Sequence, residues 1–191
     1  MKFSKNLISK LFLILTINQF FFNTPKIQAA ENIKIIYSMF SRTITVKNLK
    51  DFAENGNSSN NLKRILNATN TPHNKIQTVL NKNVEIPITI ASKLLYSEIG
   101  NVFLTRLSSI IHTPNTNDER TGMFALRASV IQGIDLGNGK INLIKFFEGY
   151  PTETVILDVK ALSKVINKVE SLSELLDFFT NKPLEKIKKI K

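Results

Sequence analysis

The chain has 191 residues, with 26 Lys and Arg against 15 Asp and Glu, 42% hydrophobic residues and no cysteine. A chain of this length buries about 70% of the surface that its unfolded form exposes, so it needs no disulfide or metal to fold. The lack of cysteine excludes a disulfide framework, a Cys-ligated zinc site, an iron–sulfur cluster and thiol catalysis.

The N-terminal residues have the pattern of a secretory signal peptide. Three lysines among the first ten residues precede an apolar run over residues 11–22, which is shorter than the about 20 residues of a membrane-spanning helix. The small residues Ala29 and Ala30 follow, and cleavage after Ala29 suits them best. We therefore expect residues 1–29 to be a signal peptide, and an internal apolar helix is the alternative that the preceding lysines disfavour.

The net charge of +11 is concentrated at the two ends of the sequence. Residues 1–29 hold four lysines and no acid, and residues 182–191 hold five lysines and one Glu, so residues 30–181 carry only +3. A nucleic-acid-binding domain concentrates Lys and Arg on one folded face, so we expect no nucleic-acid partner. The basic C-terminal tail, residues 182–191, offers a weak contact with an anionic membrane as the alternative to a solvated end.

In chain order, the first half of the expected mature protein predicts a small sheet followed by short helices. Apolar residues alternate over residues 33–37 and 44–46 around a turn, which predicts a β-hairpin. Apolar residues at helical spacing then predict amphipathic helices. These helices start near Leu49, after Ser59, after Thr71-Pro72 and after Pro87, and the last presents Ile90, Ala91, Leu94 and Leu95 on one face.

The second half predicts further helices and a third strand. Ser97 is expected to cap a longer helix that reaches Ile111, and a helix over about residues 122–132 is apolar around more than half of its circumference. We expect the latter to be the central helix. The remaining elements are a helix over Leu143 to Phe147, a strand at 155–157 that pairs with the hairpin, a helix capped by Asp158, and a last helix over 172–179.

These elements predict a mainly α fold. We expect one domain over residues 30–181, made of about eight short helices, a small N-terminal β-hairpin and a third short strand.

Four stretches of the sequence resemble a known family. The resemblance is to a domain of unknown function that usually stands at the N-terminus of secreted α/β-hydrolase-like proteins, mainly of cyanobacteria, and it runs over about residues 30–162. It implies a mostly helical accessory domain, an association with hydrolases, and export to the periplasm, the thylakoid lumen or the extracellular space. In this sequence the domain is expected to stand without the hydrolase part. The stretches are Ala30-Glu31-Asn32-Ile33, Leu94-Leu95-Tyr96-Ser97-Glu98-Ile99-Gly100, Gly122-Met123-Phe124-Ala125-Leu126-Arg127-Ala128, and Phe146-Phe147 ahead of Tyr150-Pro151.

The residues needed for hydrolase chemistry are missing from the sequence. An α/β-hydrolase carries its Ser on a Gly-x-Ser-x-Gly elbow and its His late in the chain. No Ser here is framed in this way, and His73 and His112 are the only histidines. We expect both histidines at solvated helix ends, and we expect no catalytic residue, no metal and no cofactor. An unrecognised pair of catalytic carboxylates stays open as an alternative.

Arg127 is the residue most suggestive of a site, because it lies between Leu126 and Ala128 on the expected central helix. A buried guanidinium needs a partner. One interpretation is structural, with Arg127 tied to Glu98 or to carbonyls at a helix end. The other is a site for an anionic ligand.

Three functions remain open at this point. We expect a non-catalytic, exported accessory or interaction domain with an unknown protein partner. The first alternative is an accessory or truncated form of a secreted α/β-hydrolase that acts with a hydrolase encoded elsewhere. The second alternative is a peripheral binder of membrane surfaces through the basic tail.

The signal-peptide interpretation predicts that the mature protein begins at Ala30. Intact-mass measurement of the protein from the exported fraction should show the loss of residues 1–29, because the small residues at 29–30 suit signal peptidase. An intact N-terminal Met1 in a membrane fraction would contradict this prediction.

Overall fold

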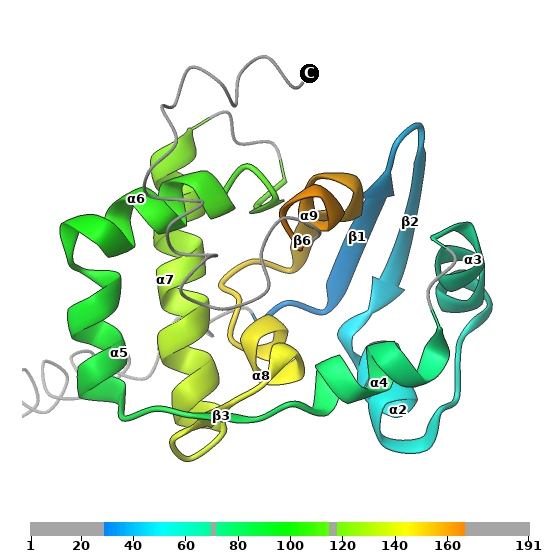
Figure 1. The fold of residues 1–191 in the computed structure, drawn as a ribbon, viewed down its shortest axis with the longest axis horizontal. Helices are drawn as coiled ribbons and strands as arrows, with labels where there is room; N and C mark the ends of the chain where they lie inside the picture. The colour runs from blue at the N-terminus through cyan, green and yellow to red at the C-terminus, as the bar shows by residue number, and fades with distance from the viewer. Residues whose placement is uncertain (1–28, 70–71, 115–117, 167–191) are drawn as a thin grey trace, which may run out of the picture.

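The structure, a computed structural model, describes residues 29–69, 72–114 and 118–166 (Figure 1). The expected signal peptide, the last predicted helix over 172–179 and the basic tail lie outside these residues. Within them the chain forms eight helices and six strands. The expected mainly α fold is therefore confirmed.

The N-terminal hairpin is present as expected. Strands β1 (Asn32–Tyr37) and β2 (Phe40–Thr45) pair antiparallel, with Ile33 opposite Ile44. The turn between them places Ser38 at a φ of 55°, in the left-handed region that a tight hairpin turn requires. Ile33 and Ile44 are both buried, so this face of the hairpin belongs to the core.

The expected third strand also forms, and it lies beside β1 rather than β2. β6 (Thr154–Asp158) runs parallel to β1 and places Val155 opposite Ile33. A short strand, β4 (Ile111–His112), pairs antiparallel with the other edge of β6, which gives the strand order β2-β1-β6-β4. The sheet therefore joins the beginning and the end of the described chain.

Three short helices follow the hairpin, and the first two of them pack against β2 (Figure 1). Their caps explain where they start and stop, because Thr45 and Ser59 accept hydrogen bonds from the backbone N–H groups of Asn48 and Leu62. Gly56 ends the first helix with a φ of 73°, as the Asn55-Gly56 pair predicts. The helices are α2 (Val46–Asn55), α3 (Asn60–Ala68) and α4 (His73–Asn81).

The prediction of one long helix from Ser97 to Ile111 is wrong. The separate helix predicted after Pro87 is present as α5 (Ile88–Leu95), and Ser97 caps α6 (Glu98–Leu107) as predicted. However, α6 ends at Leu107, and after a turn the chain enters the sheet as β4. Ser108 and Ser109 donate their hydroxyl hydrogens to the carbonyls of Thr105 and Arg106, and such side-chain bonds compete with a continuing helix. Pairing with β6 then outweighs the local helical pattern of the following residues.

Helix α7 (Glu119–Leu136) is the central helix, and it is longer than expected at both ends. It packs against α5, α6 and β4, and also against α8 (Leu143–Glu148) and β5 (Lys140–Ile141). Leu126 and Ile134 on this helix are fully buried. Asp118 caps it by accepting hydrogen bonds from the backbone N–H of Arg120 and the hydroxyl of Thr121. The hydrogen bond from Arg120 is the main cause of a lowered pKa of the Asp118 carboxyl.

Helix α8 (Leu143–Glu148) lies unusually close to α7. A Cβ atom at Gly133 would come within 2.9 Å of the Lys145 carbonyl oxygen, and one at Gly149 within 2.8 Å of the Ser129 carbonyl oxygen. Ser129 is fully buried and donates its hydroxyl hydrogen to the Phe146 carbonyl. The two backbones approach this closely because neither glycine has a side chain.

The remaining elements connect these helices. β3 (Val84–Glu85) and β5 (Lys140–Ile141) form a separate two-stranded sheet, which is not among the elements expected from the sequence. Between α7 and β5, Asn138 and Gly139 both have positive φ, as expected for the Gly137-Asn138-Gly139 break. Asp158 accepts a hydrogen bond from the Ala161 backbone N–H and caps α9 (Val159–Ile166), as predicted.

The close approach of α7 and α8 predicts that Gly133→Ala is destabilising. Ala at an open helical position stabilises by about 1 kcal/mol relative to Gly. Here the added methyl group meets the backbone of α8, so we expect a net loss of about 1 to 3 kcal/mol in the free energy of unfolding, measured by urea denaturation.

The matched control is Asp135→Ala, an exposed position of the same helix that also gains helix propensity. It should leave the stability unchanged or slightly raised. A Gly133→Ala protein as stable as the Asp135→Ala protein would contradict the close approach.

Candidate functional site

Arg127 is a charged residue that α7 carries into the interior, where it is only 6% exposed. Its Nε and Nη2 atoms donate to the carbonyl oxygen of Leu95 at 3.2 and 3.1 Å. Nη2 also donates to Oδ1 of Asn101 at 2.6 Å. One guanidinium on α7 thus holds the end of α5 and the first turns of α6.

The helix-end carbonyl is one of the two structural partners expected for Arg127, and Glu98 is the other. Glu98 is exposed, and it forms no ion pair with Arg127 in the described part of the chain. The carbonyls at the end of α5 lack helical partners and carry partial negative charge, which favours a cation there. The use of Arg127 as a site for an anionic ligand stays a prediction.

Two aromatic rings flank the Arg127 guanidinium. Its Cζ atom lies 4.2 Å from the ring centroid of Tyr96 and 5.6 Å from that of Phe124, so both rings make cation–π contacts. Tyr96 is 64% exposed and Phe124 is 56% exposed. This arrangement is not among the features expected from the sequence, although the three-residue spacing of Phe124 and Arg127 on a helix is a signal for it.

Large apolar side chains are exposed on the same three helices. This corrects the expectation that Ile90 and Leu94 share a buried face with Ala91 and Leu95, because only Ala91 and Leu95 are buried. We call the exposed set the α5–α6–α7 face. It consists of Ile88, Ile90, Leu94, Tyr96, Ile99, Val102 and Phe124.

The two histidines lie in different environments. His73 is exposed at the first residue of α4, as expected for a helix end, and its ring packs edge-on against Phe52 with centroids 5.9 Å apart. The placement of His112 at a helix end is wrong, because it lies in β4, where its Nδ1 is 3.0 Å from the Thr113 carbonyl oxygen. Within residues 29–69, 72–114 and 118–166, no three His, Cys, Asp or Glu side chains cluster as metal ligands would.

Tyr150, in the stretch that carries the family resemblance, is a core residue. Its side chain is fully buried beside the Phe146 ring, and burial raises the pKa of its hydroxyl. The hydroxyl has no hydrogen-bond partner among the residues that the structure describes. Burial therefore favours the protonated phenol, and the ring of Tyr150 packs in the core.

Comparison with known families agrees with the resemblance. A family model described as an alpha/beta hydrolase of unknown function, DUF1400, matches residues 29–158. The chain belongs to this family. The matched residues begin immediately before β1 and end at the last residue of β6, so they include the whole four-stranded sheet.

Other comparisons add nothing to this assignment. No curated protein and no solved structure matches the chain. No helix in the described ranges is long and apolar enough to cross a membrane. Export, the N-terminal placement of the DUF1400 domain and a cyanobacterial origin stay predictions.

The contacts of Arg127 predict how its replacement affects stability. Arg127→Ala removes three hydrogen bonds from a charged donor and leaves the Leu95 carbonyl without this partner, so we expect a loss of about 2 to 4 kcal/mol in the free energy of unfolding. Asn101→Ala should lower the free energy of unfolding by about 1 to 2 kcal/mol, because it removes only the hydrogen bond that Arg127 donates to the Asn101 side chain. Thermal melting checks both.

Glu98→Gln is the control that separates the two structural interpretations of Arg127. It should change the stability by less than about 0.5 kcal/mol, because exposed charges away from a network contribute little. A loss of stability in Glu98→Gln as large as that in Arg127→Ala would instead support an ion pair between Glu98 and Arg127.

Proposed function

We propose that the chain is a non-catalytic, exported accessory domain that binds a folded partner protein through the α5–α6–α7 face. The single observation that carries this proposal is the exposure of apolar side chains on a helix that is also apolar on its buried side. α5 buries Ala91 and Leu95 while it exposes Ile88, Ile90 and Leu94. Burial of Ala91 and Leu95 accounts for only part of the apolar surface of α5, and large apolar side chains left exposed on neighbouring helices mark interaction surfaces.

The chemistry of the face supports a protein partner. Tyr, Phe and Arg are the residues enriched at the centres of protein interfaces, and here Tyr96 and Phe124 pack on Arg127. The guanidinium is already fixed by Leu95 and Asn101, so little side-chain freedom is lost when a partner covers the rings. Lys93 and Glu98 are exposed on the same helices and provide polar groups beside the apolar residues.

The proposed partner is an α/β-hydrolase encoded elsewhere. Two facts support it. The family to which the chain belongs is described as an alpha/beta hydrolase, and the sequence has no Ser on a Gly-x-Ser-x-Gly elbow and no His after His112. We infer that an enzyme which carries these residues is the partner.

The test is site-specific photo-crosslinking of the full chain in its own cells. A photoreactive phenylalanine analogue replaces Leu94 on the α5–α6–α7 face, and in a matched control it replaces Val79 on α4. Both positions are 46% exposed and apolar, so they differ mainly in location. We expect Leu94 to give a product that contains peptides of an exported α/β-hydrolase, and Val79 to give none.

Three outcomes would overturn the proposal. A product that contains only a second copy of this chain would make the face a self-association surface. A product with lipid, lost on deletion of residues 182–191, would favour the membrane alternative. Equal products at Leu94 and Val79 would remove the special role of the face.

With the purified hydrolase, Leu94→Asp should weaken binding by at least about tenfold, as for a residue near the centre of an interface.

A further inference from the structure

A groove lies between the hairpin and α3, at the opposite end of the molecule from α5 (Figure 1). Its volume is about 90 Å³. Three residues of the hairpin that line it are apolar, and α3 contributes Ile65 and Ala68 from the other side. The full lining consists of Ile35, Tyr37, Phe40, Ser41, Arg42, Arg64, Ile65, Ala68 and Thr69.

The groove exists because α3 covers only part of the hairpin face. One face of the hairpin carries the residue pairs Ile33 with Ile44, Ile35 with Arg42, and Tyr37 with Phe40. Near the first pair the helix is held close, because Asn61 donates from Nδ2 to the Thr43 carbonyl at 3.0 Å. Toward the turn this cover is lost, and the exposed fraction rises from 2% at Ile44 to 68% at Phe40.

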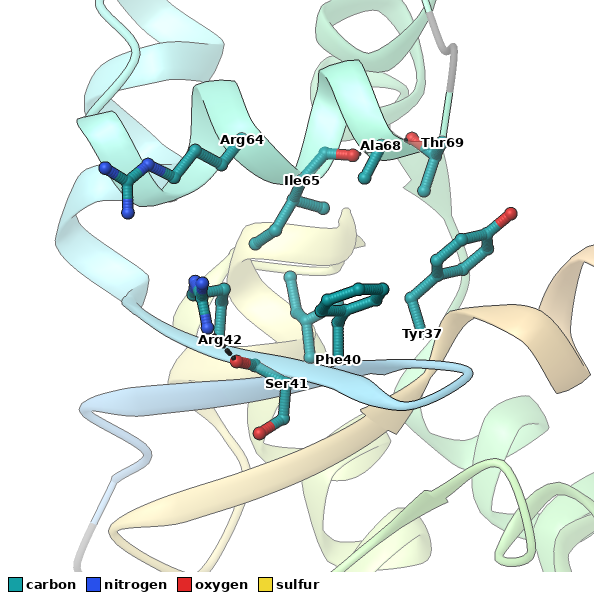
Figure 2. A pocket seen from close by; sticks show the side chains of 9 residues that line it. Tyr37, Phe40, Ser41, Arg42, Arg64, Ile65, Ala68 and Thr69 are labelled. Carbon is teal, nitrogen blue, oxygen red and sulfur yellow. Dashed lines mark hydrogen bonds between the residues drawn. The ribbon is translucent and has the colours of Figure 1, made fainter.

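The two ends of the groove differ in chemistry. The guanidinium groups of Arg42 and Arg64 lie at one end, and Tyr37 and Thr69 lie at the other, with Ile65 facing Phe40 between them (Figure 2). Neither arginine forms an ion pair in the part of the chain that the structure describes. Arg42 donates one hydrogen bond, from Nη1 to the Ser41 carbonyl, and its other donors are available. The result is an apolar slot with two cations at one end.

We propose that this groove binds a small monocarboxylate with an aliphatic chain. The chain would lie between Ile65 and Phe40, and the carboxylate would accept hydrogen bonds from Arg42 and Arg64. The planar fork of a guanidinium matches a carboxylate, and the two arginines come from elements that the Asn61 contact holds together. This proposal is independent of the α5–α6–α7 face and of any hydrolase partner.

A phosphate head group suits the groove less well than a carboxylate. The helical part of the lining begins at Arg64, beyond the first turn of α3, so the N-terminus of this helix does not line the groove. The Thr69 hydroxyl is no donor to a ligand here, because it donates to the carbonyls of Ile65 and Leu66. Phosphate sites usually offer helix N-termini or several backbone N–H groups instead.

The test is a titration of the full chain with sodium butyrate, hexanoate and octanoate, followed by NMR chemical-shift changes. We expect shifts that centre on the hairpin and α3, and an affinity that rises about fourfold for each methylene that enters the groove. 1-Octanol and octyl phosphate replace the carboxylate and carry one more methylene, and each should still bind at least about tenfold more weakly than octanoate.

Two variants and a control locate the site. Arg64→Gln removes a head-group contact and should weaken octanoate binding by about tenfold. Ala68→Phe fills the groove and should abolish binding. Both positions are exposed, so neither change threatens the core. The control is Lys63→Gln, which removes the same charge from an exposed position of α3 that does not line the groove, and it should leave the affinity unchanged.

Four results would overturn the proposal. These are the absence of shifts at millimolar octanoate, equal binding of 1-octanol, tighter binding of octyl phosphate, and equal losses in Lys63→Gln and Arg64→Gln. Leu94→Asp should not affect octanoate binding, so failure of the groove and failure of the proposed partner surface are separate results.

Discussion

The parallel pairing of β1 with β6 is the constraint on which the rest of the structure depends. It places Val155 opposite Ile33 and both are fully buried, so the first and last strands of the family match meet at the centre of the sheet. Parallel neighbours need a connection that crosses from one end of the sheet to the other. In this chain that connection contains β2, β4 and every helix from α2 to α8. All of these elements must pack so that the connection starts at the end of β1 and returns to the start of β6 beside it.

α7 organises the connection through two kinds of contact. On the α8 side, Gly133 and Gly149 let backbones meet, so packing there depends on the absence of side chains. On the α5 and α6 side, the buried Arg127 donates hydrogen bonds to Leu95 and Asn101, so packing there depends on a long polar side chain. In the second arrangement α5 buries Ala91 and Leu95, and its residues Ile90 and Leu94 stay exposed.

Local patterns predict much of the fold, and long-range contacts account for what they miss. The hairpin, the caps at Ser59 and Ser97 and the start of α9 follow from neighbouring residues. Ile111 fits a helical pattern equally well, and only its pairing with Leu157 decides that it is a strand. The burial of Arg127 follows from its apolar neighbours in sequence, whereas its partner at Leu95 depends on how α5 packs on α7. Similarly, Arg42 and Arg64 line one groove only because α3 packs on the hairpin, which their sequence neighbours do not reveal.

The β1–β6 pair also has a consequence for the order of folding. Asn32 pairs with Thr154, so the sheet has high contact order, and the entropy of closing the intervening chain opposes its formation until late. In a chain that emerges from its N-terminus first, from a ribosome or a membrane pore, the hairpin and short helices form from neighbouring residues while β1 still lacks β6. Commitment to the native state therefore waits for residue 158, and any fragment that ends earlier lacks the strand that completes the centre of the sheet.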